Sequence, residues 1–273
     1  MQAPLGYNAG VELLTYLLSG AVAGLMAGLL GIGGGLVIVP ALAMLFARHG
    51  FSADMVMHYA VGTSLATIIP TSISSLLAHH RRGSVHWQVV RSMAPGILLG
   101  ALASAWLARQ TSSAGLELLF GVFVLLVAVQ LLLGVKPASH RQLPGVVGLS
   151  VAGSMIGLLS GLLGIGGATM TVPFLLWHRA DIRLAVGTAA AVGLPIAIAG
   201  ATGFVLSGLD VPAQPGNNSG FVYWPAVASV ALASVPMAPL GARLAHYLPL
   251  ATLQRVFALL LVVIAVKMIL GVS

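Results

Sequence analysis

Two glycine clusters, each inside an apolar stretch, are the residues of this sequence most able to bind a ligand. Stretch 28–35 reads GLLGIGGG and stretch 161–168 reads GLLGIGGA, and a proline follows each at the same distance, at Pro40 and Pro173. Glycine lets a backbone approach a ligand closely, and the free N–H groups and positive dipole end of a helix start attract anions. Each cluster therefore predicts an anion-binding helix start, with close packing through small residues as the alternative. The predicted amide donors are Gly33, Gly34, Gly35, Gly166 and Gly167.

Hydroxyl side chains accompany the clusters. In the predicted helix 55–78, Thr63, Thr67, Thr71 and Ser74 fall at helical spacing on one face, and the second half keeps fewer hydroxyls, so we expect an asymmetric site. Hydroxyls can donate to the oxygens of an anion without adding a fixed charge. The alternative is that they bond back to carbonyl groups of their own helix. The predicted hydroxyl ligands are Thr63, Ser64, Thr67, Thr169 and Thr188. Thr171 is expected to add a further hydroxyl to the second cluster, and Ser72 lies near the stripe.

The composition indicates which solvent surrounds the chain. Of 273 residues, 59% are hydrophobic and 6% are charged, whereas a soluble domain has about 25% charged residues. So little polar surface cannot cover a globule in water, and we predict that a lipid bilayer is the main partner. The net charge of +7 is explained by loops beside anionic lipid, so nucleic acid is excluded as a partner.

The apolar stretches form two sets of five around a polar joint. The same marker residues occur in the same order in both sets. Val-Gly-Thr occurs at 61–63 and at 186–188, and Trp87 matches Trp224. Such self-similarity is typical of transporter repeats. We predict an all-α membrane protein with a first repeat at 1–135, a cytoplasmic linker at 136–144 and a second repeat at 145–273. The stretches are 10–30, 36–47, 55–78, 87–108, 114–134, 145–163, 168–177, 184–206, 223–242 and 250–270.

The basic residues indicate how the repeats are oriented. If each glycine-rich stretch crosses the membrane once, the 12 Lys and Arg residues divide evenly between the two sides. If each stretch reverses the chain, only Arg48, Arg109 and Lys267 lie opposite the others, as the positive-inside rule requires. Stretches 36–47 and 168–177 are also too short to span a bilayer at about 1.5 Å per residue. We therefore predict inverted repeats with re-entrant glycine-rich helices. The residues sharing one side are Arg81, Arg82, Arg91, Lys136, Arg141, Arg179, Arg183, Arg243 and Arg255.

Few other residues can do chemistry inside the membrane. All five carboxylates lie near segment ends or in loops, which argues against a cation path. His58 and His178 are candidates for coupling protons to transport, although single histidines near helix ends are more often only hydrogen-bonded. The sequence has no cysteine, and no carboxylate accompanies its histidine-rich loop at a metal-binding spacing. We therefore predict no metal, no cofactor and no enzymatic activity.

The paired Gly-Leu-Leu-Gly-Ile-Gly-Gly elements, each followed by a proline, together with Gly-Thr-Ser at 62–64 and Gly-Thr-Ala at 187–189, resemble the sulfite exporter TauE/SafE family, also called the toluenesulfonate uptake permease family. The likeness extends from about residue 10 to residue 271. Members are inner-membrane transporters of sulfite, sulfoacetate and other organosulfonates. The resemblance therefore implies small sulfur-containing anions as substrates and the bacterial inner membrane as the location. Ala168 departs from the repeat, because the first cluster has Gly35 at that position.

These patterns together predict a secondary transporter of a small sulfur-containing anion that works by alternating access. The two glycine-rich half-helices are expected to meet near the membrane midplane and to hold the anion between them. Two other functions stay open from the sequence, a membrane-embedded lipid-phosphate hydrolase and a passive anion channel. The hydrolase would need a general acid and a general base beside the clusters, where the sequence has neither. The sequence makes no prediction of the oligomeric state.

Overall fold

The computed structural model describes residues 9–30, 34–133, 142–212, 214–244 and 250–271. These residues form ten α-helices and one short antiparallel β-hairpin, in which Asn218 pairs with Tyr223 and Ser219 with Val222. The predicted all-α architecture is confirmed. The helices are α1 (Ala9–Leu30), α2 (Gly35–Arg48), α3 (Val56–Arg81), α4 (Trp87–Arg109), α5 (Ser113–Leu133), α6 (Val146–Leu163), α7 (Ala168–Trp177), α8 (Ile182–Ser207), α9 (Trp224–Leu244) and α10 (Leu250–Ile269). The strands are β1 (Asn218–Ser219) and β2 (Val222–Tyr223).

Large apolar side chains cover the outer surface of the bundle. Leu99 is 70% exposed and Leu232 is 73% exposed, and many other leucines and valines on the outer helices are similarly uncovered. A protein in water would bury such a surface, whereas a bilayer covers it. Within the described residues, six helices are long and apolar enough to cross a membrane: α3, α4, α5, α6, α8 and the Trp224–Gly241 part of α9. The chain is therefore a multi-pass membrane protein.

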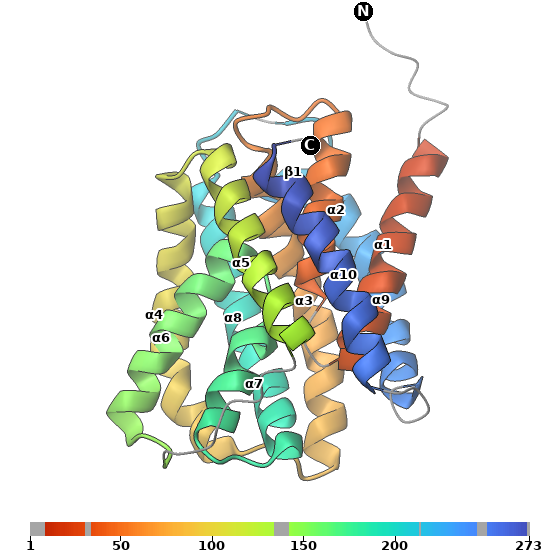
Figure 1. Cartoon of the computed structure of the whole chain (residues 1–273). Coiled ribbons are helices and arrows are strands. Elements are labelled where there is room, and N and C mark those ends of the chain that lie inside the picture. The colour runs from red at the N-terminus through yellow and green to blue at the C-terminus, as the bar shows by residue number, and fades with distance from the viewer. Residues whose placement is uncertain (1–8, 31–33, 134–141, 213, 245–249, 272–273) are drawn as a thin grey trace, which may run out of the picture.

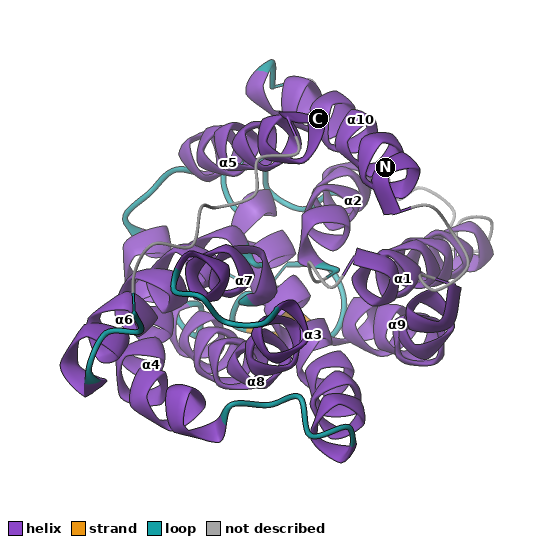
Figure 2. Cartoon of the chain, turned by 60° about the horizontal axis from the view of Figure 1, so that its bottom comes forward, coloured by secondary structure: helices purple, strands orange, loops and turns teal. Residues whose placement is uncertain are grey.

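The two short helices, α2 and α7, lie inside the bundle together with α3 and α8. Viewed from one end, α2, α3, α7 and α8 occupy the middle, and three helix pairs lie around them (Figure 2). The pairs are α1 with α9, α4 with α6, and α5 with α10. Each pair joins one helix from the first half of the chain to one from the second. The two halves are therefore interlocked rather than separate lobes.

Small residues allow two of these pairs to pack closely. Gly20 and Gly24 of α1 lie against the backbone of α9, and Gly153 and Gly157 of α6 lie in the same way against the backbone of α4. A side chain at any of these glycines would clash with a carbonyl group of the neighbouring helix. The two pairs of glycines occupy matching positions in the two halves, so the packing is repeated as well as the sequence.

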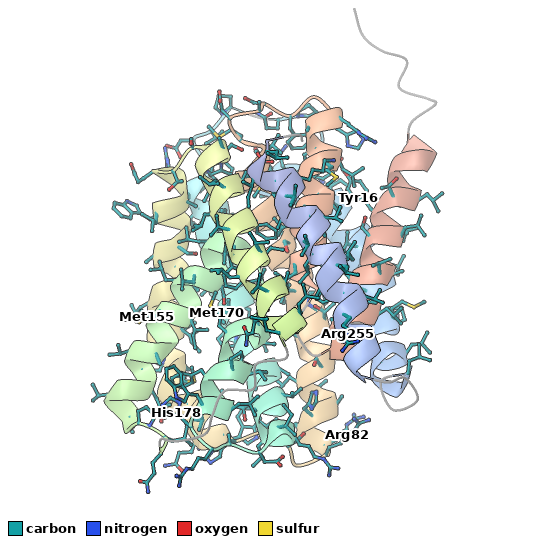
Figure 3. The ribbon with its side chains drawn as sticks, viewed as in Figure 1. Tyr16, Arg82, Met155, Met170, His178 and Arg255 are labelled. Carbon is teal, nitrogen blue, oxygen red and sulfur yellow. The ribbon has the colours of Figure 1, made fainter. Side chains whose placement is uncertain are left out.

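The glycine-rich hairpins open toward opposite ends of the molecule. The outer ends of α1 and α2 lie at the top of Figure 1, and the outer ends of α6 and α7 lie at the bottom. Arg82, His178 and Arg255 lie toward the bottom and Tyr16 lies toward the top (Figure 3). We call the bottom end, with the α3–α4 and α7–α8 loops, the basic face, and the other end the opposite face. The inverted relation of the two whole halves and the repeat boundaries stay predictions, and most of the predicted linker, 136–144, lies outside the described residues.

Candidate functional site

The two glycine-rich turns contact each other in the middle of the bundle. A Cβ atom at Gly35, the first residue of α2, would lie 2.6 Å from the carbonyl oxygen of Gly164 and 2.7 Å from the Cα atom of Ile165. Only glycine allows the start of α2 to approach the second turn this closely. Gly34 precedes this contact as the N-cap residue of α2, and Gly33 lies outside the described residues. The turns therefore meet by direct backbone packing.

The second turn is built by a glycine with a left-handed backbone. Gly164 has φ 64° and ends α6, and the N–H of Ile165 donates to the carbonyl of Ser160 at 3.0 Å. Glycine is the usual residue at such a helix end because it has no Cβ atom to clash. After three more residues α7 begins at Ala168. The sequence thereby ends one helix and starts the next within the depth of the bundle.

The start of α7 carries backbone N–H groups that are not used within the protein. In the described part of the chain, the N–H groups of Gly166, Gly167 and Ala168 have no hydrogen-bond acceptor. The first N–H groups of every helix lack intrahelical partners and carry the positive end of the helix dipole. At membrane depth water cannot readily supply the missing acceptors. An anion is the ligand that these groups favour.

Two hydroxyl groups and a glycine surround this helix start. Thr171 is fully buried, and its hydroxyl has no hydrogen-bond partner in the described structure. This hydroxyl lies 3.5 Å from the position of a Cβ atom at Gly167. A Cβ atom at Gly193 of α8 would lie 3.4 Å from Ser72 Oγ and 3.9 Å from the nitrogen of Gly167. We call Ser72, Gly166, Gly167, Thr171 and Gly193 the α7 site.

The α7 site has local space. Among the described residues, a Cβ atom at Gly166 would meet only the Cγ2 atom of Ile68, at 4.0 Å. By contrast, the backbone of the second turn occupies the space beside Gly35 at the start of α2. In the part of the chain that the structure describes, the two glycine clusters are thus unequal, and the second is the one that borders space next to unpartnered polar groups.

Comparisons with known proteins agree with this architecture. The family model described as Sulfite exporter TauE/SafE matches residues 16–268. The chain belongs to this family. It is 37% identical to a probable membrane transporter protein of Haemophilus influenzae, over 94% of this chain and 98% of the relative. It is 29% identical to the probable membrane transporter protein YunE of Bacillus subtilis, over 69% of this chain and 77% of the relative, and 27% identical to a probable membrane transporter protein of Methanocaldococcus jannaschii, over 80% and 77%.

The resemblance inferred from the glycine motifs is therefore confirmed over nearly the whole chain. No solved structure is significantly similar to it. The family and the names of the relatives identify a membrane transporter and point away from an enzyme. A transporter needs a site that binds its substrate and releases it again, and the residues predicted for that site can now be located.

Two of the predicted hydroxyl ligands of this TauE/SafE transporter already donate their protons to carbonyl groups. Ser64 Oγ donates to the carbonyl of Gly164 at 2.7 Å, and Thr67 Oγ1 donates to the carbonyl of Ser64 at 2.6 Å. A hydroxyl has one hydrogen atom, so neither can donate to an anion in this conformation. Thr67 follows the alternative of bonding within its own helix. Ser64 instead ties α3 to the second glycine turn.

Thr63 and Thr188 have a structural partner that the sequence does not reveal. The fully buried Thr63 Oγ1 accepts the N–H of Tyr223 at 3.0 Å, and the fully buried Thr188 Oγ1 accepts the N–H of His86 at 2.9 Å. The preceding glycine in each motif leaves no room for a side chain beside the partner segment. Each Gly-Thr motif therefore fixes the chain just before a helix of the other half. Thr63 lies toward the opposite face and Thr188 toward the basic face.

The remaining predicted residue, Thr169, is half-buried in the first turn of α7, next to Gly166 and Gly167. The α7 site also contains Ser72 and Gly193, which were not among the predicted ligands. Ser72 could have been selected as a hydroxyl close to the predicted positions, whereas Thr171 was already expected to add a hydroxyl to the second cluster. Gly193 gave no signal, because a glycine within a membrane span is usually explained by packing.

Neither histidine proposed for proton coupling lies at the start of α7. His58 Nε2 donates to the carbonyl of Ala108 at 2.9 Å, and His178 Nδ1 donates to the carbonyl of Phe174 at 2.7 Å. Both are hydrogen-bonded near helix ends, as the simpler interpretation expects. Proton coupling by either residue stays a prediction.

Proposed function

We propose that the protein is a secondary transporter that moves a small sulfur-containing oxyanion, such as sulfite or an organosulfonate, across the bacterial inner membrane by alternating access. The substrate class comes from the description of the family, sulfite exporter. The basic face is proposed to be cytoplasmic, in keeping with the positive-inside rule. Two inverted repeats, 1–135 and 145–273, would supply the two interchangeable arrangements that alternating access needs.

One observation carries the proposal that the substrate binds at the α7 site. Thr171 is fully buried, and within the described residues its hydroxyl has no hydrogen-bond partner. It lies beside the N–H groups of Gly166 and Gly167, which also lack acceptors there. A buried polar group without a partner destabilises a protein by about 1–3 kcal/mol. An oxyanion at the start of α7 would accept hydrogen bonds from this hydroxyl and from both amides.

The chemistry of the α7 site suits a transported anion better than a tightly held one. Backbone amides and hydroxyls provide partial positive charge, whereas a lysine or arginine would add a full charge that holds the anion strongly. Ser72 supplies a second hydroxyl from α3, on the side of Gly193. Elements from both halves therefore surround the substrate, so a movement between the halves can open and close the site.

A hydrolase is less well supported than a transporter. Hydrolysis of a lipid phosphate needs a general acid and a general base that reach the substrate. The five residues of the α7 site offer only hydroxyls and backbone groups. A passive channel would share the site and differ only in coupling, so a test of uphill movement separates the two.

Two glycine-to-alanine variants test the α7 site without disturbing the fold. An added methyl group would meet its nearest neighbour at 4.0 Å in Gly166→Ala and at 3.4 Å in Gly193→Ala, which are ordinary contact distances. Each methyl group occupies the space proposed for the anion. In proteoliposomes we expect both variants to insert normally and to lose at least about tenfold in uptake of labelled sulfite or sulfoacetate.

The matched control is Gly145→Ala. Gly145 precedes α6 at the basic face, and no described atom lies within 4 Å of an added Cβ atom there. Its uptake should equal that of the unchanged protein. Full uptake by correctly inserted Gly166→Ala and Gly193→Ala would reject the α7 site. Uphill uptake driven by an imposed ion gradient would support a secondary transporter, and strictly downhill movement would support a channel.

A further inference from the structure

A second candidate site lies at the basic face, away from the α7 site. It is a cavity of about 230 Å³ between the C-terminal end of α7, the start of α8 and the start of α4. One water molecule needs only about 10–15 Å³ of such space, so the cavity can hold a small anion with several waters. The polar residues that line it are His86, His178, Arg179, Asp181 and Thr188.

The matching place at the opposite face is filled with aromatic rings. Phe46, which lies as far after Pro40 as Arg179 lies after Pro173, packs on Phe51 with ring centroids 4.6 Å apart. Tyr223, the counterpart of His86 in front of the repeated tryptophan, lies 5.6 Å from Phe46. Phe46 and Phe51 are both buried. Positions that close the opposite face therefore carry basic and imidazole side chains at the basic face.

Arg179 has an unusual backbone for its residue type. Its φ is 62°, in the left-handed region, and the N–H of Ala180 donates to the carbonyl of Leu175 at 3.1 Å across it. This is the helix-ending position that glycine normally occupies. Arginine with this backbone is uncommon, and backbone strain of this kind collects at functional sites.

The cavity leads toward the α7 site along one face of α8. Leu184 and Thr188 line it at helical spacing, and Val192 follows one turn later. The Cγ1 atom of Val192 lies 3.2 Å from the position of a Cβ atom at Gly167. The inner end of the cavity is thus about one helical turn from the α7 site.

We propose that this cavity is an anion-binding vestibule, in which Arg179 attracts a small sulfonate or similar oxyanion before it reaches the α7 site. The inference rests on the proposed function for its role in transport. Asp181 is the acidic residue of the lining, and one oxygen of its carboxylate accepts the N–H of Arg183 at 2.8 Å as the N-cap of α8, whose positive helix end lies beside this negative charge. The guanidinium of Arg179 is the matching positive group for an anion.

Charge-selective labelling of a single introduced cysteine tests the vestibule. The sequence has no cysteine of its own, so no native cysteine has to be removed first. Leu184→Cys places a thiol in the cavity wall, and Gly145→Cys places a reference thiol on the exposed surface of the same face. Each variant is treated with a small sulfonate-bearing methanethiosulfonate and, separately, with its trimethylammonium analogue. The ratio of the anionic rate to the cationic rate should be at least about fivefold higher at position 184 than at position 145.

Changes at Arg179 show whether that residue is the cause. Arg179→Gly suits the left-handed backbone and removes the charge. The protein should therefore fold, and the ratio of anionic to cationic labelling rates at position 184 should fall to the value at position 145; we call the difference between these two ratios the excess. Arg179→Lys keeps the charge and should retain most of the excess. The matched control is Arg183→Gln, an exposed residue of the next turn, which should change the ratio less than twofold. Equal ratios at positions 184 and 145, or an excess that survives Arg179→Gly, would overturn the vestibule.

The vestibule and the proposed transport function can be rejected independently of each other. If the unchanged protein takes up labelled anion and the labelling shows no excess, only the vestibule is rejected. If the excess is present and depends on Arg179 while the unchanged protein moves no sulfur-containing anion in proteoliposomes, the anion-binding cavity is supported and the proposed function is rejected.

Discussion

Replacing Thr171 by valine should separate stability from transport. The Thr171 hydroxyl is fully buried and has no partner in the described structure, so it carries an unrelieved desolvation penalty of about 1–3 kcal/mol. Valine has nearly the same shape and no hydroxyl. The ligand-free variant should therefore be more stable than the unchanged protein by about 1–3 kcal/mol. For chains of about 150–250 residues each kcal/mol raises the Tm by roughly 2–4 °C.

The same change should weaken anion binding. A hydrogen bond from a hydroxyl to a charged group contributes about 1.5–3 kcal/mol, which corresponds to about 10- to 150-fold in affinity at about 1.4 kcal/mol per factor of ten. Thr171→Val should therefore lower uptake at subsaturating substrate by a similar factor. It should also need a correspondingly higher anion concentration to reach the same ligand-induced rise in Tm.

The measurement pairs thermal unfolding in detergent with uptake in proteoliposomes, with Ser104→Ala as the control. Ser104 is also fully buried, but its hydroxyl donates to the carbonyl of Ala101 at 2.7 Å. Its removal should leave uptake unchanged and should not raise the Tm. If Thr171→Val lowers the Tm, or raises it without reducing uptake, an unpartnered hydroxyl awaiting an anion is the wrong explanation for this residue.

Three further changes test the framework around the site. Gly35→Ala should strongly reduce the folded fraction in size-exclusion chromatography, because its methyl group would lie 2.6 Å from a backbone carbonyl oxygen of the second turn. Thr188→Val removes the acceptor for the N–H of His86 and should lower stability in detergent by about 1–3 kcal/mol, and an unchanged Tm would contradict its bracing role. Hydrogen bonds from Arg109 hold the pKa of Asp210 below its usual value, so this exposed pair contributes above about pH 4 and is lost as the pH falls further. Asp210→Asn should thus change the Tm only slightly at neutral pH, with the difference vanishing in acid.

The membrane architecture could be predicted from the sequence because it depends on local patterns. Long apolar stretches specify spanning helices, and the length of stretch 168–177 already limits α7 to half the membrane depth. The distribution of basic residues predicted that the glycine-rich stretches reverse the chain, and the hairpins in Figure 1 are arranged in that way. These features follow from the solvent and from backbone geometry.

The direction of each hydroxyl could not be predicted in this way. Helical spacing identifies the face on which Thr63 and Thr67 lie, but it cannot tell whether a proton goes to a ligand or to a carbonyl. Thr67 bonds three residues back in its own helix, whereas Thr63 meets a partner 160 residues away. Such partners depend on how the two halves interlock, which no local pattern contains. The same is true of Gly193, whose importance comes from facing Ser72 and Gly167.

The matched bonds of Thr63 and Thr188 bear on how the proposed transport cycle can move. Each holds a segment of the other half, and both are present together, so a motion that exchanges the roles of the two halves need not break either one. The bond from Ser64 to Gly164 is different, because Ala189 stands at the matching position and has no hydroxyl. This bond ties α3 to the turn that carries the proposed anion site. An arrangement with the roles of the two halves exchanged would therefore have no equivalent of this bond. The difference between Ser64 and Ala189 would make one direction of access the more stable resting state.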